Sequence, residues 1–214
     1  EMNQGVIGST TNAQGLFIFN SHFYDSAMIQ IFTNNSYKDV AIVNNHLDYS
    51  ANHLIYSSIS HGLIYNNQLS RPAFGRTAYR LSGGWFSNPN NYVWISDNKM
   101  SGWVDPRTYD KHGRAFSNGQ RYNFVLVDLS PNVGHEDKAI KDIVFTRNKV
   151  TDAEVLLQVG ASKDISIIDN TFKSQDDSMS PRIALSDRFS RRPLKNINII
   201  ANEIVTKLAR KLDN

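Results

Sequence analysis

The sequence contains no cysteine among its 214 residues, so neither a disulfide framework nor a thiolate metal site can form. It has a single Asn-Gly pair, Asn118-Gly119, whereas a series of antiparallel hairpins needs such tight turns at regular intervals. No run approaches the roughly 18 apolar residues of a membrane-spanning helix. The six histidines include no i, i+4 pair, and we find neither a phosphate-binding glycine loop nor a serine nucleophile elbow. We therefore predict no membrane span and no metal centre.

The chain also has only a moderate number of charged residues of either sign. Lys and Arg number 23 against 20 Asp and Glu, which gives a net charge of +3. A weak positive field attracts polyanions such as nucleic acid or acidic polysaccharide. Because the basic residues are spread along the chain and do not cluster with aromatic residues, we predict no nucleic-acid partner.

The chain does contain a short frame that recurs around an asparagine. In each copy an apolar residue stands three positions before the asparagine and another stands two positions after it. The six asparagines are Asn45, Asn67, Asn98, Asn148, Asn170 and Asn202. A seventh copy carries Ser21 in the same slot, and the successive intervals from Ser21 are 24, 22, 31, 50, 22 and 32 residues. Such periods, each with a short strand of alternating hydrophobicity, indicate a solenoid.

The asparagine falls where the chain has to turn, since Asn tolerates left-handed backbone angles and bonds to nearby backbone. Asparagines stacked coil upon coil can also bond to one another and satisfy polar groups inside the solenoid. A second strand is predicted between successive asparagines, at residues 28–33, 53–58, 78–82, 124–128, 154–159 and 182–187. Parallel stacking of each strand on its copy in the next coil follows. His22 and His46 both come directly after a ladder position, so we expect them to stack on the surface in a structural role.

This pattern resembles the right-handed parallel β-helix of the pectate-lyase-like superfamily over residues 12–205. The resemblance implies an all-β fold: one right-handed parallel β-helix domain over residues 1–214, with about seven to eight coils. Uronic-acid polymers are frequent substrates in that fold group, so the resemblance implies an acidic polysaccharide as partner. It also implies a secreted, periplasmic or cell-surface location.

Both ends of a solenoid need protection for the open strand edge. Coil-like sequence begins almost at once, at residues 5–8, so we expect the chain to lack an N-terminal cap, as in a truncated or processed protein. At the other end, residues 203–214 place Ile204, Val205, Leu208 and Leu212 at helical spacing. We therefore predict a short amphipathic capping helix there.

Chemistry is expected where the repeat is interrupted, because loops that project from a rigid solenoid carry function. The longest interval, between Asn98 and Asn148, contains a predicted inserted loop at residues 101–121. This loop groups aromatic and ionisable side chains that can stack on sugars, pair with a uronate carboxylate or transfer a proton. We predict His112, Tyr109 and Arg114 as catalytic, and Trp103, Asp105, Arg107 and Lys111 as substrate-binding.

The Asp105-Pro106 pair is similar to the Asp-Pro-His signature of mannuronan C5-epimerases, which share the β-helix fold. Arg107 stands where that family has histidine. The resemblance implies C5-proton abstraction on a uronan, either as a lyase or as an epimerase. A solvated loop without catalytic role is the alternative.

An outward strand row is the second part of the predicted site. Alternation places Tyr79 and Leu81 inward and Arg80 outward. We predict Arg80 as catalytic and expect it to line a groove with further substrate-binding side chains, which are Asp128, Gln158 and Arg182, with Gln30 and Ala184 on the same outer face. A solvated outer face gives the same alternation without a ligand.

The paired residues Asp176-Asp177 resemble the Asp-Asp segment of polygalacturonase-type hydrolases, which activate water with several acidic groups. The Gly-His-Gly turn and Arg-Ile-Lys strand expected there are missing. We predict no cofactor, with Ca²⁺ at these aspartates as the one candidate cation. Two other classes of function stay open. The chain could be a glycan-binding or hydrolytic spike of the phage-tail or adhesin kind, which would be a trimer, or a non-catalytic scaffold.

Overall fold

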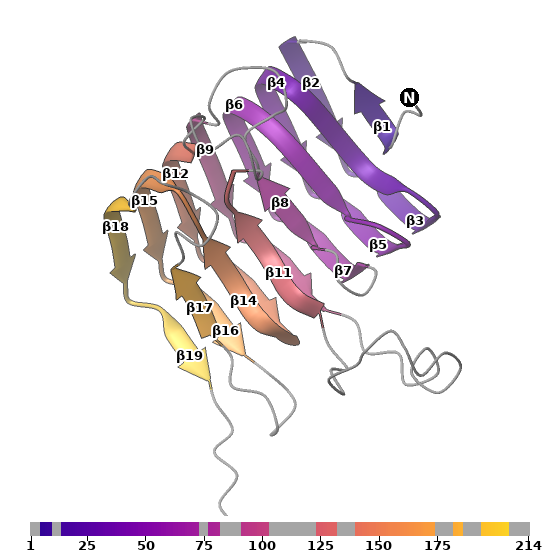
Figure 1. Ribbon diagram of the computed structural model, residues 1–214. Coiled ribbons are helices and arrows are strands. Elements are labelled where there is room, and N and C mark those ends of the chain that lie inside the picture. Colours follow the sequence, from indigo (N-terminus) through magenta and orange to yellow (C-terminus); the bar gives the residue numbers. More distant parts are fainter. Residues whose placement is uncertain are drawn as a thin grey trace, which may run out of the picture.

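The computed structural model describes residues 5–9, 14–72, 77–81, 91–102, 123–131, 140–173, 182–185 and 194–205. These residues form a parallel β-solenoid in which the chain winds through stacked coils (Figure 1). Every strand pairing in the described part is parallel. The all-β, stacked-strand architecture predicted from the asparagine frame is therefore confirmed.

Each coil contributes one strand segment to each of three faces, which we number in the order in which the chain meets them. Face 1 contains β1 (Gly5–Ser9), the first part of β4 (Ile29–Val43), the first part of β6 (Ile55–Tyr65), β8 (Tyr79–Leu81), β11 (Asn123–Leu129), β14 (Ala153–Val159) and β17 (Arg182–Leu185). Face 2 contains β2 (Gln14–Phe19), the second parts of β4 and β6, β9 (Asn91–Ser96), β12 (Ile140–Thr146), β15 (Ser162–Ile168) and β18 (Lys195–Ile200). Face 3 contains β3 (His22–Ser26), β5 (His46–Ser50), β7 (Gln68–Pro72), β10 (Lys99–Ser101), β13 (Lys149–Thr151), β16 (Thr171–Lys173) and β19 (Glu203–Val205).

The long strands β4 and β6 run round the corner between face 1 and face 2. Ile31 pairs with Ile55 in face 1, and Ile42 pairs with Ile64 in face 2, with a register irregularity between the two halves. Faces 1 and 2 consequently belong to one 12-stranded sheet, and face 3 is a separate 7-stranded sheet. The seven strands of face 3 correspond to seven described coils.

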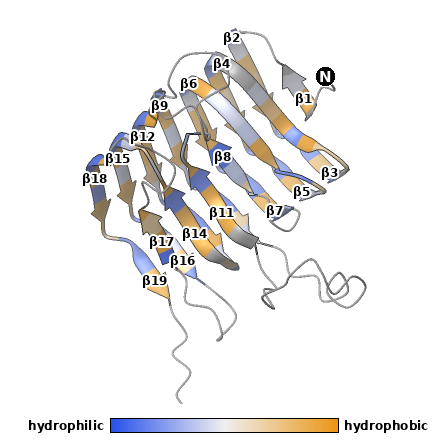
Figure 2. Ribbon diagram, viewed as in Figure 1, coloured by the Kyte–Doolittle hydropathy of each residue, from blue (hydrophilic) through white to orange (hydrophobic). Residues whose placement is uncertain are grey.

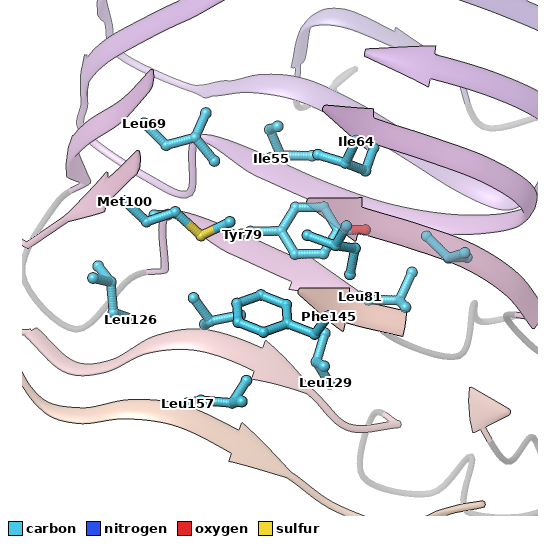
Figure 3. Packing of buried hydrophobic residues seen from close by; sticks show 14 of the residues in the cluster. Ile55, Ile64, Leu69, Tyr79, Leu81, Met100, Leu126, Leu129, Phe145 and Leu157 are labelled. Atoms are coloured by element: carbon cyan, nitrogen blue, oxygen red, sulfur yellow. The ribbon is translucent and has the colours of Figure 1, made fainter. Parts of the chain in front are cut away.

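The interior is built from rows of apolar side chains, one residue per coil. In face 1 the inward row contains Ile31, Ile55, Tyr79, Val127 and Leu157, all fully buried. Figure 3 shows Tyr79 and Phe145 inside the coils, where Leu69 and Met100 also lie. Apolar and polar residues alternate along many of the strands (Figure 2). Since burial of a large apolar side chain contributes about 1.5–3 kcal/mol, these rows supply the main stabilisation of the solenoid.

The predicted asparagine ladder is present. Asn45, Asn67, Asn98, Asn148 and Asn170 each donate a hydrogen bond from Nδ2 to Oδ1 of the next ladder asparagine, at 2.9–3.1 Å. Their backbone N–H groups donate to the same oxygens at 2.8–3.0 Å. Ser21 starts the ladder, because its N–H donates to Asn45 Oδ1 at 2.9 Å. The asparagine side chains thus satisfy buried polar groups, as expected.

The left-handed bend lies one residue before the predicted place. Positive φ angles occur not at Ser21 and the ladder asparagines but at the seven residues that precede them, which are Asn20, Asn44, Asn66, Asp97, Arg147, Asp169 and Ala201. Five of these seven are Asn or Asp, the residue types that tolerate this conformation best. The ladder side chain is consequently free to point inward.

The predicted C-terminal helix is wrong for its first three residues. Glu203–Val205 form strand β19, in which Ile204 pairs with Phe172 of β16. Ile204 therefore continues the inward row of face 3, so its spacing comes from the strand repeat. Residues 206–214 lie outside the described residues. The predicted insert at 101–121 also begins too early, since Ser101 ends strand β10.

Candidate functional site

Most of the predicted site falls in a segment that the structure does not describe. Residues 103–122 contain seven of the predicted site residues, which are Trp103, Asp105, Arg107, Tyr109, Lys111, His112 and Arg114. Asp176 and Asp177 lie in a second such segment, 174–181. The described part of the site consists of Arg80, Asp128, Gln158 and Arg182.

Three of these four residues lie side by side on the outside of face 1. Arg80 of β8 pairs with Asp128 of β11, and Asp128 pairs with Gln158 of β14. The same row continues to Tyr56 of β6 on one side and to Ala184 of β17 on the other. We call these five residues the face 1 row. Each coil contributes one side chain to this row, of which Asp128 is buried and the other four are half-buried, and neighbouring strands lie about 4.8 Å apart.

Arg80 and Asp128 form an ion pair within the row. Arg80 Nε lies 3.5 Å from Asp128 Oδ2. The guanidinium carbon of Arg80 lies 5.3 Å from the centre of the Tyr56 ring, a distance typical of a cation–π contact. The hydroxyl of Ser130 donates a hydrogen bond to Asp128 Oδ1. The carboxylate is consequently held by a cation on one side and by a hydroxyl on the other.

Burial raises the pKa of the Asp128 carboxyl above its ordinary value, while the charge of Arg80 and the Ser130 hydrogen bond oppose the rise. The Asp128 side chain is only 10% exposed, which accounts for the dominance of desolvation. A carboxyl group with a raised pKa titrates closer to neutral pH, where it can accept and release a proton. For Asp128 the two influences oppose each other, because the buried carboxyl is also the partner of Arg80 in the ion pair.

Arg182 lies on the same strand as Ala184 but two residues earlier, opposite Val155, and it is exposed. It is therefore not a neighbour of Arg80. Gln30 is fully buried, not exposed on the outer face as predicted. Its amide donates to the backbone carbonyls of Asp48 and Tyr49 at 3.0 and 2.9 Å. The prediction for Gln30 is wrong because the residue of β4 in register with Tyr56 and Arg80 is Phe32, and Gln30 stands two positions earlier.

A second polar cluster lies on the outside of face 3 and was not predicted as a site. Asp48 accepts hydrogen bonds from Ser70 Oγ at 2.7 Å and from Arg71 Nε at 2.8 Å. The Arg71 hydrogen bond is the main cause that lowers the pKa of Asp48. His22 and His46 stack nearby with ring centres 4.3 Å apart, as expected from their shared position after the ladder.

Sequence reasoning could find the histidine pair because the frame aligns the two residues. It could not find the pair of Asp48 and Arg71, which are 23 residues apart and belong to no repeated motif. These groups satisfy one another within the cluster. We therefore regard the face 3 cluster as a stabilising network.

The described residues contain no group of three or more His, Asp or Glu side chains that could hold a metal ion. Within the same part of the chain, no helix has the length and apolar character needed to cross a membrane. The candidate site thus consists of the face 1 row, with an ion pair, an aromatic ring and an amide.

Comparison with protein-family models, with curated proteins and with solved structures gave no match for this chain. The class of protein is accordingly defined by the fold alone, as a parallel β-solenoid.

Proposed function

We propose that the protein binds an acidic, uronic-acid-containing polysaccharide along face 1 and modifies it by C5-proton abstraction, as a lyase or a C5-epimerase. The observation that supports this most is the face 1 row, in which Tyr56, Arg80, Asp128 and Gln158 occupy successive coils. A linear polymer fits a linear row because each coil offers a further contact along the same direction. We also propose that the chain is a right-handed β-helix of the pectate-lyase-like superfamily, since parallel crossovers are almost always right-handed.

The chemistry of the row fits the charges of a uronan. The Arg80 guanidinium can pair with a sugar carboxylate and reduce the cost of removing the C5 proton. The Tyr56 ring offers an apolar face to a sugar, and the Gln158 amide can bond to hydroxyl groups. Asp128, with its raised pKa, is suited to exchange a proton with the sugar or the leaving oxygen.

The insert supplies the remaining groups in this proposal. Residues 103–122 join the end of β10 to the start of β11, the strand that carries Asp128. His112 and Tyr109 are the proposed bases for the C5 proton, and Arg114 is a further partner for the carboxylate. Trp103, Asp105, Arg107 and Lys111 are proposed to bind neighbouring sugars, together with Arg182 at the far end of face 1.

Glycan binding without catalysis is the second candidate function. It is favoured by the ion pair of Arg80 and Asp128, since these two groups already neutralise each other. In such a protein the row would serve recognition alone, as in a spike or adhesin.

The test is incubation of the full chain with alginate, pectate and glycosaminoglycans. A lyase produces an unsaturated sugar that absorbs in the ultraviolet, and an epimerase exchanges the C5 hydrogen with deuterated solvent. We expect Asp128→Asn to lower kcat by about 100-fold, within the range for loss of an acid–base group. We expect Arg80→Ala to lower kcat/KM by a similar factor, since it removes the partner of the carboxylate.

Arg147→Ala is the matched control, because Arg147 is also ion-paired but lies at the opposite corner, on Asp97 at 2.7 Å. It should leave turnover unchanged. If the chain turned over no uronan but bound one, and Arg80→Ala weakened that binding, the result would support glycan binding without catalysis. If the chain neither turned over nor bound any uronan, both candidate functions would be contradicted.

A further inference from the structure

The outside of face 2 carries a strip of apolar side chains over five successive coils, of which Phe17, Phe19, Leu63, Tyr65 and Trp94 are exposed and the rest are half-buried. One register row contains Phe17, Ala41, Leu63, Trp94 and Val144. The row two residues further along the strands begins with Phe19, Val43 and Tyr65. We call these eight residues the face 2 strip. Phe17 is 60% exposed and Trp94 is 47% exposed, although a single-copy surface rarely leaves large apolar side chains together in water.

The strip is uncharged, and polar groups border it on both sides. On one side Asp39 accepts a hydrogen bond from Gln14 at 2.7 Å and lies 3.7 Å from His61. On the other side Asn66 donates to Asn44 at 2.7 Å, and Arg147 pairs with Asp97 at 2.7 Å. Asp97 and Arg147 thus neutralise each other, whereas Asp39 is hydrogen-bonded to Gln14, and the exposed Lys38 lies on the same border in register with Gln14. An apolar surface with a polar rim is the usual anatomy of a protein–protein interface.

The exposed apolar area of the face 2 strip is large enough for a small specific interface. An aromatic side chain offers about 150–250 Å², so the exposed parts of Phe17, Phe19, Tyr65 and Trp94 total on the order of 400 Å². When two such strips meet, the aromatic side chains alone remove about 800 Å² from water, and their neighbours bring the contact to roughly the 1,200 Å² of a small specific interface.

We propose that the face 2 strip is a self-association surface, on which a second copy of this chain docks with the same strip. A glycan is a poorer occupant because its hydroxyl groups need partners, and this strip offers only the indole N–H of Trp94 and the hydroxyl of Tyr65. A membrane surface is also poorer, because the strip contains no Lys or Arg to meet anionic lipid. An identical strip offers matching apolar area.

The contact is a twofold one. In such an interface residue i of one copy meets residue j of the other, and j meets i. The Phe17 end of one strip then lies over the Val144 end of the partner's strip, with Leu63 near the centre. The contact leaves face 1 open, so it is independent of the proposed polysaccharide site.

The experiment is sedimentation velocity on the full chain over a range of concentrations up to tens of micromolar. We expect the unchanged chain to sediment as a dimer and the double variant Leu63→Lys, Trp94→Lys to sediment as a monomer. Both side chains are exposed, so the variant should retain its β-sheet circular dichroism spectrum and its melting temperature within a few degrees. That control separates loss of the contact from loss of the fold.

Asn198→Lys provides the matched control, because Asn198 occupies the same register row in the last described coil, outside the strip. It should remain dimeric. A wild-type chain that stays monomeric at every concentration would overturn the proposal. A dimer that persists in the double variant would also overturn it, because the contact would then lie elsewhere. A monomer that binds vesicles or a neutral glycan through Trp94 would do the same.

Discussion

At the scale of single residues, the inner ladder asparagines have three hydrogen-bonding roles: each donates to the next asparagine, donates to a backbone carbonyl and accepts from the preceding asparagine. Asn98 donates from Nδ2 to Asn148 Oδ1 and to the carbonyls of Ile64 and Ser96, each at 2.9 Å. Its own Oδ1 accepts from both the backbone and the side chain of Asn67. The residue is only 1% exposed, so water cannot replace these bonds.

We therefore predict that Asn98→Ala lowers the free energy of unfolding by about 3 kcal/mol, because several buried groups lose their partners at once. Urea denaturation measures the change. Gln68→Ala is the control: Gln68 is an exposed neighbour one coil away, and its loss should cost under about 0.5 kcal/mol. Equal effects for the two variants would contradict the buried role of the ladder.

Asp48 gives a prediction for the dependence of stability on pH. Arg71 holds the pKa of Asp48 below 3.8, so the folded state favours the ionised form. The stability that this adds is present above the unfolded pKa and is lost as the pH falls through the lower, folded pKa. Because the Arg71 side chain is 42% exposed, solvent screening limits the contribution to about 1 kcal/mol.

Asp48→Asn should accordingly lower the melting temperature at neutral pH and flatten its decline below about pH 4. Thermal melts over a pH series measure both effects. Arg71→Gln should reproduce them, and the double variant should be little worse than either single variant, since both remove one interaction. Fully additive effects would show that the two side chains act separately.

At the scale of strands, the sequence was sufficient to predict the repeat because the apolar positions of the frame coincide with the inward rows. Ile42, Ile64, Ile95 and Ile167 are all fully buried, as alternation requires. The corners between faces were not predictable in the same way. At one corner both Leu54 and Ile55 are fully buried, which no simple alternation allows.

Local periodicity also misidentified β19. Ile204 and Val205 fit a helical pattern together with Leu208 and Leu212, but the frame of Asn202 applies to the same residues. The strand prevails because Ile204 pairs with Phe172 and Glu203 N–H donates to Asn170 O at 2.8 Å. Tertiary pairing between coils thus overrides the local preference of a short segment.

For the candidate site, the sequence predicted only the register, that is, which residues lie next to one another on neighbouring strands. Alternation predicted an outward Arg80, and equivalent positions in later strands identified Asp128 and Gln158 as its neighbours. The ion pair and the raised pKa of Asp128 depend on burial and on Ser130, which the alternation pattern does not reveal. The face 3 pair of Asp48 and Arg71 depends in the same way on stacking between coils.

At the scale of the whole molecule, each coil contacts mainly the coil before and the coil after it. The inward residues of the last described coil are open: Ile199 is 45% exposed and Ile204 is 49% exposed, whereas Ile167 and Phe172 in the preceding coil are fully buried. Stability in such an array depends on neighbours, so it should be lowest at its ends.

We predict that amide hydrogen exchange is fastest in the strands of the first and last described coils, β1 to β3 and β17 to β19, and slowest in the central strands β6, β9 and β12. The difference should be roughly 100-fold or more, because end coils can open without the rest. Exchange followed by mass spectrometry with peptide resolution measures it. Uniform exchange over all strands would instead indicate a single cooperative unit.

The ladder has one further consequence, which concerns how such a chain can change length. Asn67 and Asn98 are separated by 31 residues, and Asn98 and Asn148 by 50, yet both pairs are joined by the same 2.9 Å bond. Distance along the sequence is thus uncoupled from distance along the axis. New sequence between two coils leaves the spacing of the rod intact, whereas a duplicated coil lengthens it by one fixed step of about 4.8 Å. The molecule can therefore acquire loops and acquire length by two separate genetic routes.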